Sequence, residues 1–128
     1  MNVPLAAALV YAVVTLFVVG FQVALAAGAP WGSYAMGGGR PGRFPPPLRA
    51  AALVQAALLA LIAVVVLDAG EVLSLGWTTG LPWLAWIPVV VSLASTVANA
   101  ATRSAVERRL WLPVAMVMLL SSVVVALR

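Results

Sequence analysis

The side chains in this sequence that could take part in chemistry are mostly amides and hydroxyls placed inside apolar runs. Gln22 and Gln55 lie in the first and second of these runs, and Thr96 and Asn99 lie in the third. At a rise of 1.5 Å per residue, Gln22 and Gln55 would sit roughly 9–12 Å inside the same edge of a helical bundle. We interpret these four residues either as a polar pocket or as interhelical hydrogen bonds that hold the helices together.

The ionisable residues form no catalytic motif. Asp68 and Glu71 have no base near them in the sequence, so we expect them to be solvated charges at a membrane edge. Ser104 and Glu107, in "SAVE", match a capping box in which Ser104 caps a helix and Glu107 reaches back to the Ser104 amide. Histidine and cysteine are absent, which excludes disulfides and the common zinc sites. The sequence therefore favours a non-enzymatic protein with no metal or cofactor.

Arginines gather in two connections between the apolar runs. Residues 29–49, "APWGSYAMGGGRPGRFPPPLR", combine arginines with glycines and aromatic rings, and residues 102–109 form the second basic connection. Such segments attract anionic lipid headgroups, although arginines that simply orient the chain in a membrane are the simpler interpretation. The candidate contacts to an anion or lipid headgroup are Trp31, Gly32, Tyr34, Arg40, Arg43, Arg49, Arg103, Arg108 and Arg109.

The apolar runs that must position these residues are long enough to cross a membrane. With 65% hydrophobic and 8% charged residues, the chain falls far below the roughly 25% charge of a soluble domain. A spanning helix needs about 20 apolar residues, and residues 4–27, 47–67, 82–101 and 110–127 supply four such runs. The sequence predicts an all-α, integral membrane four-helix bundle that is antiparallel and forms one domain over residues 1–128. We expect the first run to be a retained span.

The distribution of charge predicts the orientation of this bundle. The first and third connections carry the arginines, whereas the second carries Asp68 and Glu71 without a base. The positive-inside rule therefore places the basic connections in the cytoplasm and both termini outside. We expect a multi-pass protein of the bacterial plasma membrane. Its expected partners are membrane lipid and a homo-oligomer or larger membrane complex, and nucleic acid is not expected because the arginines lie between apolar runs.

Two stretches resemble a known group of proteins. They are "GAPWGSYAMGG" followed by "PPPLRAAALVQA", and "TRSAVERRLWLPVA". Together they resemble small four-span membrane proteins of high-GC Gram-positive (actinobacterial) bacteria, which have a Gly-Ala-Pro-Trp-Gly loop and an Arg-Ser-x-x-Glu-Arg turn. By position, the motif residues are Trp31, Gly32, Arg49, Arg103, Ser104, Glu107 and Arg108. Many of these loops carry an acidic residue where this chain has Ser33. The resemblance implies a four-span fold and a membrane location, and no particular reaction.

Two functional hypotheses follow from these observations. The first is a non-enzymatic membrane protein, a subunit or homo-oligomer, whose basic cytoplasmic loops contact anionic lipid headgroups or a partner. The second is a transporter or carrier of a small neutral or amphipathic solute that uses a cytoplasm-facing polar pocket. An enzyme acting on a lipid phosphate would need a base, for which Glu107 is the candidate. The carrier hypothesis predicts an open cavity at the depth of Gln22 and Gln55, and a bundle packed solid there would exclude it.

Overall fold

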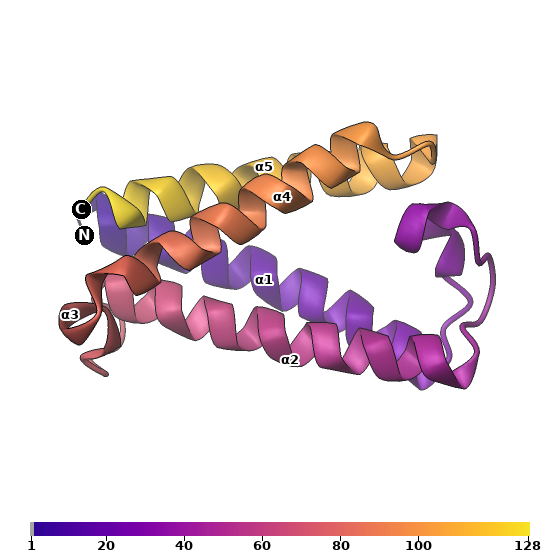
Figure 1. The fold of residues 1–128 in the computed structure, drawn as a ribbon, viewed down its shortest axis with the longest axis horizontal. Coiled ribbons are helices and arrows are strands. Elements are labelled where there is room, and N and C mark those ends of the chain that lie inside the picture. Colours follow the sequence, from indigo (N-terminus) through magenta and orange to yellow (C-terminus); the bar gives the residue numbers. More distant parts are fainter. Residues whose placement is uncertain (1) are drawn as a thin grey trace.

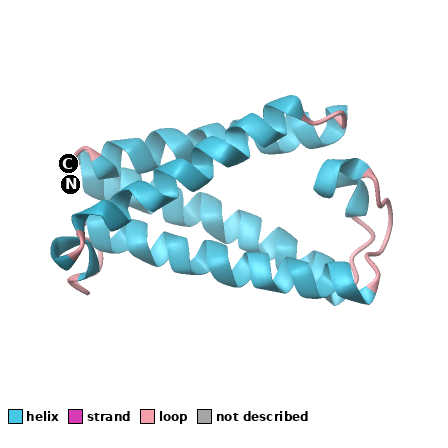
Figure 2. Ribbon diagram, viewed as in Figure 1, coloured by secondary structure: helices cyan, strands magenta, loops and turns pink. Residues whose placement is uncertain are grey.

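The computed structural model describes residues 2–128 and consists of long helices packed antiparallel (Figures 1 and 2). The long helices are α1 (Val3–Ala27), α2 (Pro46–Ala69), α4 (Ile87–Ala101) and α5 (Ala105–Ala126). Short helical turns occupy the connections: η1 (Gly32–Tyr34) and η2 (Met36–Gly38) in the first, and α3 (Trp77–Gly80) and η3 (Pro82–Trp86) in the second. The all-α antiparallel bundle predicted from the sequence is confirmed.

The ends of the helices follow from local sequence. Asn2 caps α1, because its side-chain oxygen accepts a hydrogen bond from the Leu5 amide at 2.7 Å. Gly28 ends α1 with a φ of 104°, in the left-handed region that glycine adopts without a steric penalty. Prolines begin α2, where a missing amide hydrogen costs little. The third apolar run is divided, since the turn η3 precedes α4 and Pro88 lies in the first turn of α4.

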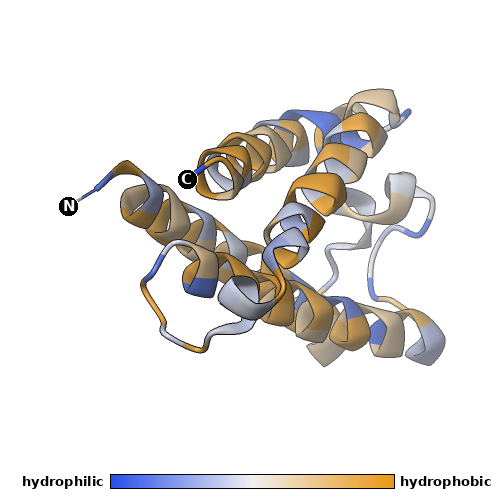
Figure 3. Cartoon of the chain, turned by 60° about the vertical axis from the view of Figure 1, so that its left-hand side comes forward, coloured by the Kyte–Doolittle hydropathy of each residue, from blue (hydrophilic) through white to orange (hydrophobic). Residues whose placement is uncertain are grey.

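Four helical segments in the described residues are long and apolar enough to cross a membrane. They are Val3–Ala27, Pro46–Ala69, Pro82–Ala101 and Ala105–Ala126. At most 33% of the residues in the most apolar part of each segment are buried within the chain, so most of the apolar surface faces outward. Figure 3 shows hydrophobic residues along these helices, with hydrophilic residues more frequent toward their ends. The chain is a small four-span membrane protein.

The helices form two hairpins, α1–α2 and α4–α5, that are joined by contacts between α1 and α5. The hairpins lie close together at the end that holds α3 and both termini, and they separate toward the other end (Figure 1). At that second end, η1 and η2 lie between the start of α2 and the connection that joins α4 to α5. We call this second end the arginine end, because it holds the basic connections, residues 28–45 and 102–104.

The buried core has two parts. One lies where the hairpins meet and includes Tyr11, Val66 and Met118, while the other lies at the arginine end and includes Leu25, Ala35, Phe44 and Ala52. Members of both parts border the space between them, and that space holds the cavity described next.

Candidate functional site: a cavity within the bundle

A cavity of about 260 Å³ lies inside the bundle and is lined by residues of α1, α2, α4, α5 and the first connection. At about 30 Å³ per water molecule, this is the space of roughly nine waters, and it is slightly smaller than the cavities that hold drug-sized ligands. Apolar side chains supply most of the wall. Its polar part includes Gln22, Gln55, Ser92, Ser95, Asn99 and Glu107.

Three of the four residues predicted as a polar pocket line this cavity together. Gln22 comes from α1, Gln55 from α2 and Asn99 from α4. Thr96 is not among the lining residues, and its hydroxyl donates to the Ser92 carbonyl oxygen at 2.7 Å. Positions 95 and 99 lie on one side of position 92 around α4 and position 96 lies on the other side, so Thr96 is at the edge of the face that lines the cavity.

Several polar atoms in the wall lack a hydrogen-bond partner within residues 2–128. Tyr11 Oη, Gln22 Oε1 and Ser92 Oγ are buried and make no well-formed hydrogen bond, although the Tyr11 and Ser92 hydroxyls face each other, and all three residues line the cavity. Each such group costs about 1–3 kcal/mol when it stays unsatisfied. Asn99 bonds within its own helix, to Ser95 O at 2.7 Å and Ser95 Oγ at 3.2 Å. The bundle is thus not packed solid at this depth, and the hydrogen bonds of the described residues include none between the amides of Gln22, Gln55 and Asn99.

An aromatic cluster forms one wall of the cavity. Trp111 is 9% exposed, and its indole N–H donates to the Tyr34 carbonyl oxygen at 2.6 Å. The Phe21 ring meets Trp111 edge to face with centroids 4.7 Å apart, and Trp31 stacks on Phe21 at 6.0 Å. The sequence placed Trp31 and Tyr34 among the candidate headgroup contacts. It gave no sign that Trp31, through Phe21, and Tyr34, through Trp111, attach the first connection to α1 and α5.

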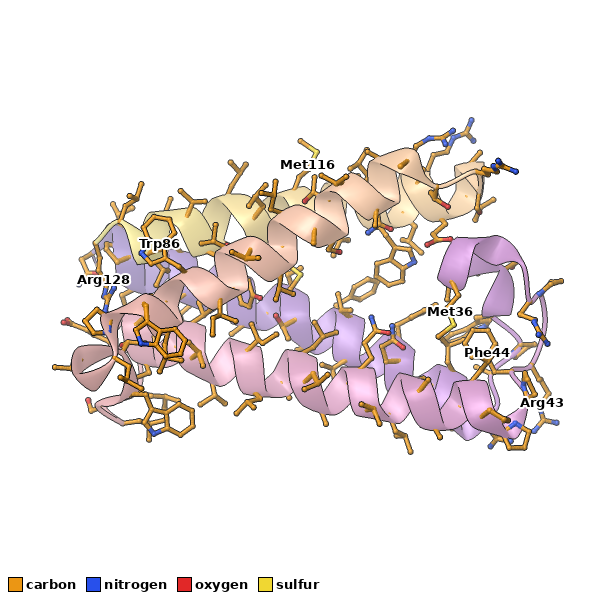
Figure 4. The ribbon with its side chains drawn as sticks, in the orientation of Figure 1. Met36, Arg43, Phe44, Trp86, Met116 and Arg128 are labelled. Atoms are coloured by element: carbon orange, nitrogen blue, oxygen red, sulfur yellow. The ribbon has the colours of Figure 1, made fainter. Side chains whose placement is uncertain are left out.

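The first connection folds back onto the bundle. The Gly32 amide donates to Gly42 O at 2.9 Å, and a Cβ on Gly32 would overlap the Arg40 carbonyl oxygen. Gly38 lies against the Ser104 side chain. This fold brings Tyr34, Ala35 and Met36 into the wall of the cavity at the arginine end. Figure 4 shows Met36 and Phe44 together at that end, and the Arg43 guanidinium lies against Gly28 at the end of α1.

Ser104 and Glu107 form half of a capping box. The Ser104 hydroxyl accepts from the Glu107 amide at 3.2 Å and caps α5. The expected return bond from Glu107 is not made, because the Ser104 amide donates instead to Thr102 Oγ1 at 3.3 Å. The Glu107 carboxylate is left with the Thr102 hydroxyl at 3.5 Å and lines the cavity.

The predicted headgroup contacts separate into exposed and internally bonded groups. Arg49 Nε donates to Ala26 O at 2.7 Å, and Arg108 Nη1 donates to Thr102 O at 2.8 Å, so both bind the chain's own backbone. Gly32 is buried, and its amide is already bonded to Gly42, which removes it as an anion contact. The exposed members at the arginine end are Trp31, Tyr34, Arg40, Arg43, Arg103 and Arg109. No arginine lines the cavity in the described structure.

Asp68, at the opposite end, differs from expectation. It is 6% exposed rather than solvated, and its carboxylate accepts from the amides of Leu75, Gly76 and Thr78 and from the Thr78 hydroxyl, at 2.7–3.1 Å. Sequence spacing gave no indication of this, because the donors lie seven to ten residues further along the chain. Glu71 is exposed as expected.

Neither a protein-family model, nor a curated protein, nor a solved structure matches the chain. No family is identified. The loop-and-turn resemblance therefore stays a prediction, and what can be inferred about function rests on the cavity and the arginine end.

Proposed function

We propose that this chain is a non-enzymatic membrane protein that binds a small amphipathic molecule in the cavity within its bundle, as a carrier does. The observation that carries the proposal is the combination of a mostly apolar wall with amide side chains that converge on it from three helices, Gln22, Gln55 and Asn99. Ligand sites are typically apolar cavities with a few convergent polar groups. An amphipathic molecule would cover the apolar wall and form hydrogen bonds with these amides.

The wall offers a route of entry beside α2. Gln55 lines the cavity and is exposed at the same time, whereas Gln22 and Ser92 on the facing helices are buried. The first connection covers the arginine end through Tyr34, Ala35 and Met36. A ligand that enters from the side of α2 would reach the polar groups without displacing that connection.

A separate observation supports a second role for the arginine end. Arg40, Arg43, Arg103 and Arg109 are exposed there. Basic residues near an anionic membrane surface contribute about 1 kcal/mol each. We therefore also propose that this end contacts anionic lipid headgroups on the cytoplasmic side of a bacterial plasma membrane. Assembly with a partner or into a homo-oligomer stays a prediction, which native mass spectrometry after mild extraction would test.

Access to the cavity can be measured with single cysteines, because the chain contains none of its own. In nanodiscs, we expect Ser95→Cys to react with N-ethylmaleimide at least about tenfold faster than Val97→Cys, since a thiol in a wet cavity ionises more readily than one in lipid. Ser95 lines the cavity and is partly exposed, and Val97 is a matched control at nearly the same depth, 59% exposed and outside the cavity wall.

A second substitution tests whether the labelling rate depends on the cavity. Ala115 is 3% exposed and lines the cavity, so Ala115→Phe should fill it and slow labelling of Ser95→Cys to the rate of Val97→Cys. Equally slow labelling of both cysteines before the cavity is filled would contradict the proposed function, because the cavity would then be closed to a small amphipathic molecule.

A further inference from the structure

Among the described residues that line the cavity, Glu107 alone carries a formal charge. It lies in the first turn of α5, where the partial positive charge of the helix N-terminus stabilises a carboxylate. A ligand in this cavity therefore meets a negative group and no positive one.

The Glu107 carboxylate is not neutralised by the arginines around it. The hydrogen bond its carboxylate makes within the described chain is to the Thr102 hydroxyl, at 3.5 Å. Arg108, the adjacent residue, donates to the Thr102 carbonyl oxygen at 2.8 Å, and Arg109 is exposed. Exposed guanidinium groups are screened by water and salt over about 8–10 Å, whereas a charge in the cavity wall acts on a bound ligand at short range.

Aromatic rings lie beside this carboxylate. Trp111 is four residues after Glu107 and shares its face of α5. Its position is fixed by the bond from its indole N–H to Tyr34 O and by the edge-to-face contact with Phe21. Trp111, Tyr34 and Phe21 all line the cavity. Aromatic faces next to a carboxylate attract cations, and tryptophan is the strongest of them.

The amides of the wall add hydrogen-bond acceptors. Gln22, Gln55 and Asn99 line the cavity, and each side chain carries a carbonyl oxygen that accepts hydrogen bonds. A protonated amine brings several N–H donors and no acceptor, so it can bond to such oxygens as well as to the Glu107 carboxylate.

From these observations we infer that the molecule bound in the cavity is an organic cation, a protonated amine on an apolar or aromatic body, whose ammonium group binds beside Glu107 and Trp111. This inference rests on the proposed function and specifies its ligand class. The apolar body lies against the aliphatic part of the wall, and the carboxylate sets the preference for positive charge.

The test compares two molecules of nearly equal shape, phenethylammonium and 2-phenylethanol, titrated calorimetrically into the protein in zwitterionic nanodiscs, with empty nanodiscs as the blank. We expect the ammonium compound to bind the unaltered chain at least about tenfold more tightly than the alcohol, as one desolvated charge contact allows. Glu107→Gln should abolish that preference.

Two control variants separate the charge from the fold. Glu71→Gln removes an exposed carboxylate at the opposite end and should keep the preference. Ser104→Ala removes the cap of α5 but keeps the Glu107 carboxylate, so it should lower stability and keep the preference as well.

The outcomes distinguish the inference from the proposed function. Equal affinity for the two compounds, or a preference that survives Glu107→Gln, would overturn the cation inference while leaving an amphipathic site in place. If neither compound binds and neither slows labelling of Ser95→Cys, both the inference and the proposed function are wrong.

Discussion

Gly32 holds the first connection in its folded form because no other residue fits its surroundings. It donates to Gly42 O at 2.9 Å, and an added Cβ would overlap Arg40 O and come within 3.0 Å of the Phe44 ring. The neighbours on two sides are backbone atoms, which cannot turn aside as a flexible side chain can. This one position therefore links the sequence of the loop to the wall of the cavity.

Gly32→Ala should destabilise the folded first connection by about 2 kcal/mol, the usual cost of forcing an extra group into a packed site. Hydrogen–deuterium exchange of residues 30–44 in detergent would detect the change as faster exchange. Gly20→Ala is the control, because Gly20 lies within α1 with nothing within 4 Å of an added Cβ. It should stabilise the helix by about 0.5–1 kcal/mol. Unchanged exchange in Gly32→Ala would show that the loop tolerates the methyl group.

Part of the cavity could be predicted from individual residues. Gln22, Gln55 and Asn99 stand out because amides are rare in apolar runs, and the rise of a helix gives their depth. Tyr11 and Glu107 could not be placed in the same way. Their position in the wall depends on how each helix is rotated about its axis and, for Glu107, on Thr102 taking the Ser104 amide. Neither of these is fixed by spacing along the chain.

Among the elements, the second connection shows most clearly how one buried charge organises a loop. Asp68 lies near the end of α2 and is bonded to three backbone amides and one hydroxyl of residues 75–78. Arg128 Nη2 reaches the same Thr78 hydroxyl at 3.5 Å. Figure 4 shows Arg128 at this end, where Trp86 also lies. The carboxylate thus fixes where α3 begins relative to α2.

Asp68→Asn should lower the free energy of unfolding by about 3 kcal/mol. The charge that strengthens the hydrogen bonds is lost, and the new amide group would face backbone N–H donors. Thermal unfolding in detergent gives the loss, and faster hydrogen exchange of residues 72–80 would locate it. Glu71→Gln, an exposed change three residues away, should leave both measurements unchanged. Equal stability of the two variants would mean that solvent replaces the Asp68 bonds without cost.

The long elements were easier to predict than their contacts. Hydrophobicity locates apolar runs because lipid imposes a minimum length on a spanning helix, and the observed helical segments begin and end within a few residues of those runs. The helix α5 starts before its apolar run, at Ala105, directly after the Ser104 cap that the sequence predicted. The sequence does not show which small residues meet a neighbouring helix. Gly20 has open space around it, whereas Gly70 lies so close to Ala8 that an added Cβ would overlap the Ala8 side chain. Close helix contact depends on which faces meet.

At the scale of the whole molecule, the two ends of the bundle differ both in charge and in how closely the hairpins pack. The hairpins separate toward the arginine end, and Glu107 and the aromatic wall of the cavity lie on that side (Figure 1). Asp68 and Glu71 lie at the opposite end, with both termini. If the positive-inside rule holds for this chain, the first connection covers the cytoplasmic end of the cavity.

Cysteine accessibility in intact cells tests this orientation directly. Gly39 is exposed at the arginine end, has a φ of −74° and nothing within 4 Å of an added Cβ, and Ser74 is exposed in the second connection. We expect a membrane-impermeant maleimide to label Ser74→Cys in intact cells and Gly39→Cys only after lysis, because the arginines are retained on the cytoplasmic side. The opposite pattern would place the basic connections outside and remove the argument for cytoplasmic headgroup contacts. Labelling of both cysteines in intact cells would show that the chain inserts in two orientations, so that the arginines alone do not determine its topology.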